Sequence, residues 1–224
     1  MFEQEIELEQ KEGSNWGPFL MIALLVGLFV GGIGVVIFQS RQTVKPEEAT
    51  AAVEARVKAL GPVTVSFHTG TVSYNGPDKP TDPQYKLLTN AGLLKVGKGK
   101  GYAALVEVTP QGKELFATVP GVQTTPDKND TTLYVVPLAS RKMVSVGTIT
   151  KLAQGRFQVN YTWQWTTTPA GEYFDVDGKN VQALSLYERS VLIDQHGANK
   201  YHQGAMKASM VLAKGTKGWE PAAN

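Results

Sequence analysis

"RFQVNYTWQWTT", residues 156–167, alternates between apolar and polar side chains and is the clearest indicator of fold in this chain. The apolar positions are Phe157, Val159, Tyr161, Trp163 and Trp165. The polar positions are Gln158, Asn160, Thr162, Gln164 and Thr166. Because successive side chains of a strand point to opposite faces of a sheet, this period of two predicts an antiparallel strand with one buried face.

The aromatic face of this strand allows two interpretations. Trp163 and Trp165 could form a surface on which a ligand or partner stacks, or they could belong to the hydrophobic core. Aromatic side chains at strand spacing are more often core. We therefore favour a core role and keep an interaction surface at these two tryptophans as the alternative.

Other parts of the second half of the chain have the same strand-like character. Strands are predicted at residues 131–138, 143–151 and 205–213. Together these segments predict an antiparallel sheet domain at 131–220, preceded by a turn-rich linker at 123–130. The closing "ASMVLAKGTKGWEPAAN", residues 208–224, resembles the end of small curved-sheet domains of the nuclear-transport-factor or cystatin kind. That resemblance implies an architecture and no activity.

Before the linker, the sequence predicts a helix, a basic hairpin and a second helix. The three segments are "LLTNAGLL" (87–94), "KVGKGKGYAALVEV" (95–108) and "TPQGKELF" (109–116). Over about residues 82–120 they resemble the last helix, the wing and the following helix of bacterial winged-helix modules. The resemblance implies a winged-helix-like unit, which we place at residues 62–122.

A DNA-reading winged helix also requires a helix immediately before its recognition helix. At that place this chain has a β-like run and the proline-rich loop "NGPDKPTDP", residues 75–83. Lys95, Lys98 and Lys100 at the hairpin tip could contact phosphates, but lysines among glycines more often form a solvated tip. We expect no nucleic-acid partner and keep these lysines as a candidate interaction surface.

A run of twenty residues without charge, Phe19–Phe38, lies near the N-terminus. As a helix it would be about 30 Å long, which matches the hydrocarbon thickness of a bilayer. A cleavable signal peptide would need a basic start, whereas residues 1–16 carry five glutamates and one lysine. The sequence predicts an acidic tail at 1–16, an uncleaved transmembrane helix at 17–40 and the lipid bilayer as a partner.

Glycines in this run suggest a surface for helix packing. Gly27 and Gly31 form a GxxxG pattern, and Gly34 continues nearly the same face. Small residues at this spacing let the backbone of another transmembrane helix approach closely, although glycine is also common in such helices without this role. We favour packing against other transmembrane subunits or a second copy of the chain.

Two opposing rules bear on the side of the membrane that residues 41–224 occupy. Basic residues follow the span at Arg41, Lys45, Arg56 and Lys58, which favours a cytoplasmic location. Long domains, however, translocate largely regardless of charge. With a bacterial source assumed, we expect a single-pass protein of the cytoplasmic (inner) membrane with a periplasmic soluble domain.

Residues 41–61 connect the span to the first strand. Pro46 begins a helical pattern with a stripe of apolar residues in "KPEEATAAVEARVKALGP", residues 45–62. This helix either extends the span as a stalk or packs as the first helix of the domain.

The residue types offer little catalytic chemistry. The chain has no cysteine, which excludes disulfides, thiolate nucleophiles and cysteine-ligated metal sites. His196 and His202 are six residues apart, which does not suit a helical pair of metal ligands. "DVDGKN", residues 175–180, begins like a calcium loop but lacks its glycine and bidentate glutamate, so a turn is preferred. We expect no catalytic residue, cofactor, metal or small-molecule substrate.

These patterns predict an α+β fold class, with one N-terminal transmembrane helix, then a winged-helix-like unit and an antiparallel β-sheet. Residues 41–224 hold 21 Lys and Arg against 15 Asp and Glu, a net charge of +6 that falls short of a nucleic-acid-binding stripe. The expected function is a non-catalytic accessory or scaffolding subunit of a larger membrane complex. Two alternatives stay open: a membrane-tethered winged-helix transcription regulator, and a periplasmic ligand-binding domain that uses the Trp163 and Trp165 face.

Overall fold

The computed structural model describes residues 43–128, 130–216 and 218–222. Outside these residues lie the expected acidic tail, the expected transmembrane helix and its glycines Gly27, Gly31 and Gly34. Within the described part, no helix is both long enough and apolar enough to cross a bilayer. Lys45–Asn224 form one compact unit.

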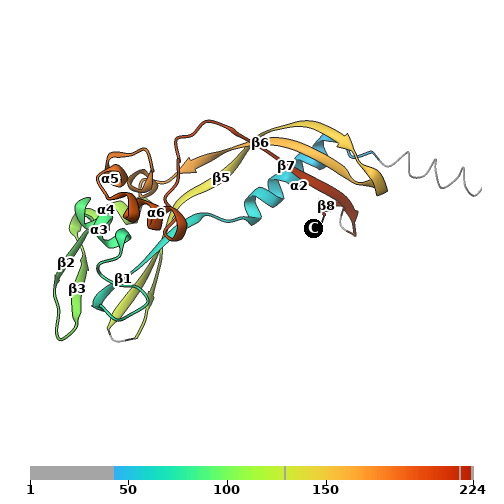
Figure 1. Cartoon of the computed structure of the whole chain (residues 1–224). Coiled ribbons are helices and arrows are strands. Elements are labelled where there is room, and N and C mark those ends of the chain that lie inside the picture. The colour runs from blue at the N-terminus through green and yellow to red at the C-terminus, as the bar shows by residue number, and fades with distance from the viewer. Residues whose placement is uncertain (1–42, 129, 217, 223–224) are drawn as a thin grey trace, which may run out of the picture. The chain divides into compact units, whose positions relative to one another are not determined.

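One antiparallel sheet of eight strands is the framework of this unit (Figure 1). Seven strands lie in the order β2-β3-β1-β5-β6-β7-β8, and β4 pairs with β5 beside this path. The strands are β1 (Val63–Ser73), β2 (Leu94–Lys98), β3 (Ala103–Val108), β4 (Gln123–Pro126), β5 (Thr131–Lys151), β6 (Phe157–Thr167), β7 (Met206–Gly215) and β8 (Gly218–Pro221).

Helices of modest length lie against the sheet. They are α2 (Pro46–Ala59), α3 (Pro83–Asn90), α4 (Pro110–Thr118), α5 (Lys179–Gln182) and α6 (Leu186–Gln195), with the 3₁₀ helices η1 (Ala153–Gly155) and η2 (Gly171–Phe174). Figure 1 shows α3, α4, α5 and α6 gathered near β1 and β3, whereas α2 lies along β5, β7 and β8.

This topology corrects the expected fold class. An α+β chain with a transmembrane helix, a winged-helix-like unit and a separate sheet is expected from the sequence, whereas the described residues form mainly one antiparallel sheet with few helices. The hairpin of the winged-helix resemblance exists as β2 and β3, but β3 pairs with β1 from Gly70↔Val106 to Ser73↔Ala103. Because β1 also pairs with β5, the hairpin extends the main sheet.

β5 is longer than the sequence patterns predict. The two expected strands, residues 131–138 and 143–151, belong to one strand of 21 residues. Its first part pairs with β1 as far as Ala139, and its second part pairs with β6. Register shifts after Met143 and after Val146 mark bulges, which let a long strand bend while it keeps its partner.

α2 packs against the sheet through small and β-branched side chains. Its buried residues are Ala49, Ala52, Val53 and Val57. These positions recur every three or four residues and therefore lie on one face of the helix, which contacts β5, β7 and β8. Pro46 occupies its first turn, where a missing backbone N–H breaks no helical hydrogen bond.

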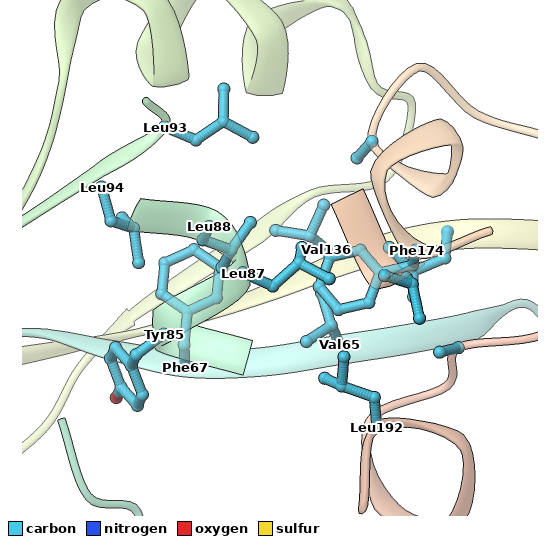
Figure 2. Packing of buried hydrophobic residues seen from close by; sticks show 14 of the residues in the cluster. Val65, Phe67, Tyr85, Leu87, Leu88, Leu93, Leu94, Val136, Phe174 and Leu192 are labelled. Atoms are coloured by element: carbon cyan, nitrogen blue, oxygen red, sulfur yellow. The ribbon is translucent and has the colours of Figure 1, made fainter. Parts of the chain in front are cut away.

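An aromatic and leucine-rich core lies beside β1 (Figure 2). Phe67 of β1 is fully buried, and its ring stacks on Tyr134 of β5 with ring centres 5.3 Å apart. The rings of Phe116 and Tyr85 lie 5.9 and 6.4 Å from it. Leucines from α3, from the start of β2 and from α6 complete the core, so it fixes these elements against the sheet.

Candidate functional site

The three lysines of the expected interaction surface lie on the β2–β3 hairpin. Lys95 and Lys98 belong to β2, Lys100 follows in the turn, and all three side chains are exposed. In the chain, α3 follows strand β1 and a loop, whereas DNA reading by a winged helix needs a preceding helix. With a strand and a loop in the place of that helix, we interpret the three lysines as a solvent-exposed hairpin tip and not as a DNA-contacting wing.

Trp163 and Trp165 pack against one another and against Arg141. Trp165 is buried and Trp163 is half-buried, with their ring centres 4.9 Å apart. The guanidinium carbon of Arg141 lies 4.7 Å from the centre of the Trp165 ring and 5.4 Å from that of Trp163. Tyr201 also contacts Trp165, at 5.4 Å. Because these neighbours occupy the rings, the contacts favour a core role over ligand stacking.

An open cleft of about 590 Å³ is lined by residues of α3, α6, β1 and the loop before α3. We call it the α3–α6 cleft. Its charged and imidazole side chains are His68, Asp78, Lys79, Asp82, Glu188 and His196. The structure thus brings together residues from three separate parts of the chain that no sequence motif connects.

Asp78 holds the loop before α3 against β1. Its Oδ2 accepts hydrogen bonds from the hydroxyl of Tyr85 at 2.6 Å and from the backbone N–H of His68 at 3.1 Å. Its Oδ1 accepts one from Nε2 of Gln84 at 2.9 Å. Burial, reinforced by the Asp78 carboxylate, raises the pKa of Tyr85, so the phenol keeps its proton and remains a donor.

His68 is enclosed by two carboxylates. Its Nδ1 lies 2.8 Å from Oδ2 of Asp78, and its Nε2 lies 3.2 Å from Oδ2 of Asp127. A general base needs a ring nitrogen within reach of the proton that it removes from a substrate. Because both nitrogens are engaged, His68 is better suited to clamping the loop. The described residues contain no group of three or more His, Asp or Glu side chains that could hold a metal ion.

Gln84, a residue of the cleft lining, has a buried side-chain oxygen without a hydrogen-bond donor among the described residues. A carboxylate can only accept, so the amide nitrogen of Gln84 must face Asp78 and the Oε1 atom must point elsewhere. This oxygen is buried, and no described residue donates a hydrogen bond to it. A buried acceptor left unpaired costs on the order of 1–3 kcal/mol.

The cleft is acidic. Three carboxylates, those of Asp78, Asp82 and Glu188, line it against the single lysine Lys79. The Lys86 ammonium, 2.7 Å from Glu188, and the hydrogen bonds from Ser185 lower the pKa of Glu188 to about 2.

His196 does not offset these negative charges at neutral pH. Burial lowers the pKa of its imidazole, although the carboxylates of Asp82 and Asp78 act in the opposite direction. The ring is therefore mainly uncharged near pH 7, below which protonation would weaken the negative potential of the cleft.

Beside the cleft, α6 presents three apolar side chains to solvent, which we call the α6 surface. Leu186, Tyr187 and Ile193 are 79%, 77% and 46% exposed. Leu186 and Ile193 are two helical turns apart and share one face of the helix. Tyr187 also lines the α3–α6 cleft, so apolar and acidic surfaces meet at this residue. Adjacent exposed hydrophobic side chains rimmed by polar groups are typical of interaction sites.

The first turn of α6 is fixed by a capping box, which sequence reasoning missed although its Ser-x-x-Glu spacing is visible in the chain. Oγ of Ser185 accepts from the backbone N–H of Glu188, and the Glu188 carboxylate accepts from the backbone N–H of Ser185 at 2.9 Å. No comparable sequence pattern identifies the other residues of the cleft.

We expect Ser185→Ala to lower the free energy of unfolding by about 1 kcal/mol, because it removes the cap of α6. Denaturant unfolding of the full-length protein in mild detergent measures this change. Ser190→Ala is the matched control, since this exposed serine lies within the same helix and caps nothing. The control should be neutral or slightly stabilising, and an equal loss in both variants would contradict a capping role.

Two features that were considered as metal-site candidates, His202 and the segment at residues 175–180, make contacts within the protein. His202 pairs with Glu172 at 2.7 Å, and this carboxylate raises the pKa of the imidazole. The Asp175 carboxylate accepts hydrogen bonds from the backbone N–H groups of Asp177, Tyr201 and His202. The contacts of Asp175 are consistent with the turn predicted for residues 175–180.

Comparisons of the chain with protein-family models, curated proteins and solved structures find no match. A function for this chain therefore rests on the α3–α6 cleft and the α6 surface. Both belong to the same compact unit, and α3 and α6 are joined by the Lys86–Glu188 ion pair.

Proposed function

We propose that this chain is a non-catalytic accessory subunit of a membrane complex, which docks a partner protein through its α6 surface. In this proposal Phe19–Phe38 is the single membrane anchor of an inner-membrane protein, and Gly27, Gly31 and Gly34 pack against a neighbouring transmembrane helix. The unit that contains α6 is periplasmic. The observation that carries the proposal is the exposure of Leu186, Tyr187 and Ile193 on one short helix.

Removing these side chains from water supplies the driving force for docking. Complete burial of one large apolar side chain contributes roughly 1.5–3 kcal/mol, so three neighbouring ones can form the centre of an interface. The helix is also held in place before binding, by buried Leu192 on its inner side and by the capping box at Ser185. Little conformational freedom is then lost when a partner binds.

Specific features favour this proposal over the two alternatives. A transcription regulator would use the β2–β3 hairpin, but strand β1 and a loop precede α3 where a DNA-reading protein has a helix. A domain that stacks ligands on Trp163 and Trp165 needs open rings, whereas Trp165 is buried and Arg141 lies against both.

Co-purification tests the docking surface. We expect replacement of Leu186, Tyr187 and Ile193 together by alanine to lower recovery of a partner protein by about tenfold or more. Full-length protein would be purified from native membranes in mild detergent, and its partners quantified by mass spectrometry. Its own abundance in the membrane should not change, because the three side chains are largely exposed.

The matched control replaces Leu60, Tyr102 and Val144 by alanine. These side chains are 46%, 69% and 49% exposed and lie outside α6. The control should retain every partner of the wild type. Equal recovery from the α6 variant and the control would refute docking through α6.

A further inference from the structure

We infer that His68, Asp78 and Asp127 form a pH-sensitive latch, which holds the end of β4 against β1 while the imidazole is protonated and releases it when the proton is lost. The inference does not depend on the docking proposal. It rests on two carboxylates that lie at the two nitrogens of one ring, and on the exposed position of β4.

Both ring nitrogens of His68 must donate for the observed arrangement to be favourable. Nδ1 lies 2.8 Å from Oδ2 of Asp78, and Nε2 lies 3.2 Å from Oδ2 of Asp127. An ionised carboxylate can only accept a hydrogen bond, and a neutral imidazole carries a proton on only one of its nitrogens. A neutral ring would therefore turn a lone pair toward one of the two carboxylates. The complete latch requires the imidazolium form.

The contact with Asp127 should break when the proton leaves. It is the longer of the two contacts, and the side chain of Asp127 is 50% exposed, against 20% for Asp78. The Oδ2 atom of Asp78 also accepts hydrogen bonds from the hydroxyl of Tyr85 and from the backbone N–H of His68, which fix this carboxylate beside the ring. The remaining proton should stay on Nδ1, where it donates to Asp78.

The end of β4 has few other attachments. Among the described strands β4 pairs with β5 alone, and its four side chains are all exposed. Asp127 follows directly, and its backbone N–H donates to the carbonyl of Thr131 at 2.9 Å across the turn to β5. His68 adds a link from this turn to β1. Loss of that link should let the end of β4 open more often, because local opening is easiest where few buried contacts oppose it.

The latch is complete over a limited pH range. Hydrogen bonds from the backbone N–H of Lys128 and from His68 lower the pKa of Asp127, so this carboxylate stays charged below the usual range for aspartate at about pH 4. Histidine side chains change charge between about pH 5 and 8. The contact is therefore lost on the acid side as the pH falls through the lowered pKa of Asp127, and on the alkaline side as His68 loses its proton.

Other groups around His68 do not replace it in the latch. Besides Asp78 and Asp127, the charged or titratable groups that surround it are Lys79, Asp82, Tyr85, Lys128, Glu188 and His196. His196 is the other imidazole among them. It lies at the end of α6, and in the described part of the chain no hydrogen bond joins it to Asp127.

NMR of the full-length protein in mild detergent tests the latch. Solvent exchange of the Asp127 amide would be measured at about pH 5 and about pH 8 and expressed as a protection factor, which removes the intrinsic pH dependence of exchange. We expect protection to fall about threefold or more at the higher pH, as for loss of a partly exposed charged contact. Nitrogen spectra of the His68 ring should show protons on both nitrogens at the lower pH and on Nδ1 alone at the higher.

Two variants separate the latch from a general effect of pH. Asp127→Asn replaces the carboxylate by an amide, which can accept from a protonated Nε2 or donate to an unprotonated one, so its protection should stay nearly constant. His202→Gln is the matched control, because His202 pairs with Glu172 at 2.7 Å outside the latch. This variant should keep the pH dependence of the wild type at Asp127.

The exchange rates and the proton positions can each overturn the latch. Constant protection of the Asp127 amide in the wild type, or an equal fall in Asp127→Asn, would show that the contact with His68 does not hold the end of β4. A proton on Nε2 alone at about pH 8 would show that Asp78 is released in place of Asp127. A fall in protection in the wild type and in His202→Gln that is absent from Asp127→Asn would support the inference.

Discussion

Replacing Phe67 by alanine is expected to lower the free energy of unfolding by about 3–5 kcal/mol, the usual loss for a large aromatic side chain in a core. Phe67 is fully buried, and its ring contacts the rings of Tyr134, Phe116 and Tyr85, which come from β5, α4 and α3. Alanine would leave a cavity where these elements meet. Denaturant unfolding of the full-length protein in mild detergent measures the loss.

Tyr102→Ala is the control for the Phe67 variant. Its side chain is 69% exposed, so truncation should change the free energy of unfolding by about 0.5 kcal/mol or less. If Phe67→Ala and Tyr102→Ala lowered the free energy of unfolding by the same amount, the aromatic cluster around Phe67 would not be the centre of the core.

Replacing Gly171 by alanine should lower the free energy of unfolding about as much as Phe67→Ala does, but through a steric clash and not through a cavity. A Cβ atom at this position would lie 2.1 Å from the backbone oxygen of Leu138 and 2.7 Å from Cγ2 of Thr167. Because one obstacle is strand backbone, η2 must move away from β5, which also disturbs the 3.1 Å hydrogen bond from the Gly171 N–H to Thr168. We expect a loss of about 3 kcal/mol or more in the same unfolding measurement, at the upper end of overpacking effects.

Gly204→Ala is the matched glycine control. An added Cβ there meets no atom within 4 Å, and the residue does not have a positive φ. The substitution should be neutral or stabilise the protein by about 0.4–1 kcal/mol, because alanine restricts the unfolded chain. A large loss at position 204, or none at 171, would show that the close contact with β5 does not constrain the fold.

Local patterns predicted those elements whose pairing is also local. The alternation at residues 156–167 corresponds to β6, Phe157–Thr167, and the helical pattern that begins at Pro46 corresponds to α2, Pro46–Ala59. The sequence predicts two strands in place of the single β5 because the polar run at residues 140–142 interrupts the apolar pattern. Pairing with β6 keeps these residues extended, since hydrogen bonds between strands do not depend on which side chains face solvent.

The cleft could not be predicted in the same way because its parts meet through tertiary structure. Asp78 and His68 become neighbours when the loop before α3 folds back on β1. The ion pair between Lys86 and Glu188 joins residues that are 102 positions apart. Sequence periodicity identifies the buried face of each element, but it does not determine which exposed faces lie together.

β5 also determines how this unit responds to a mechanical load. Its first part is bonded to β1, next to the core that holds α6, and its second part is bonded to β6; α2 packs against β5 itself and against β7 and β8. A pull between the α6 surface and α2 would therefore pass along one extended backbone and load the hydrogen bonds of both strand pairs in shear. Since many such hydrogen bonds share the load, a force applied at the α6 surface should reach α2 with little local stretching of the backbone.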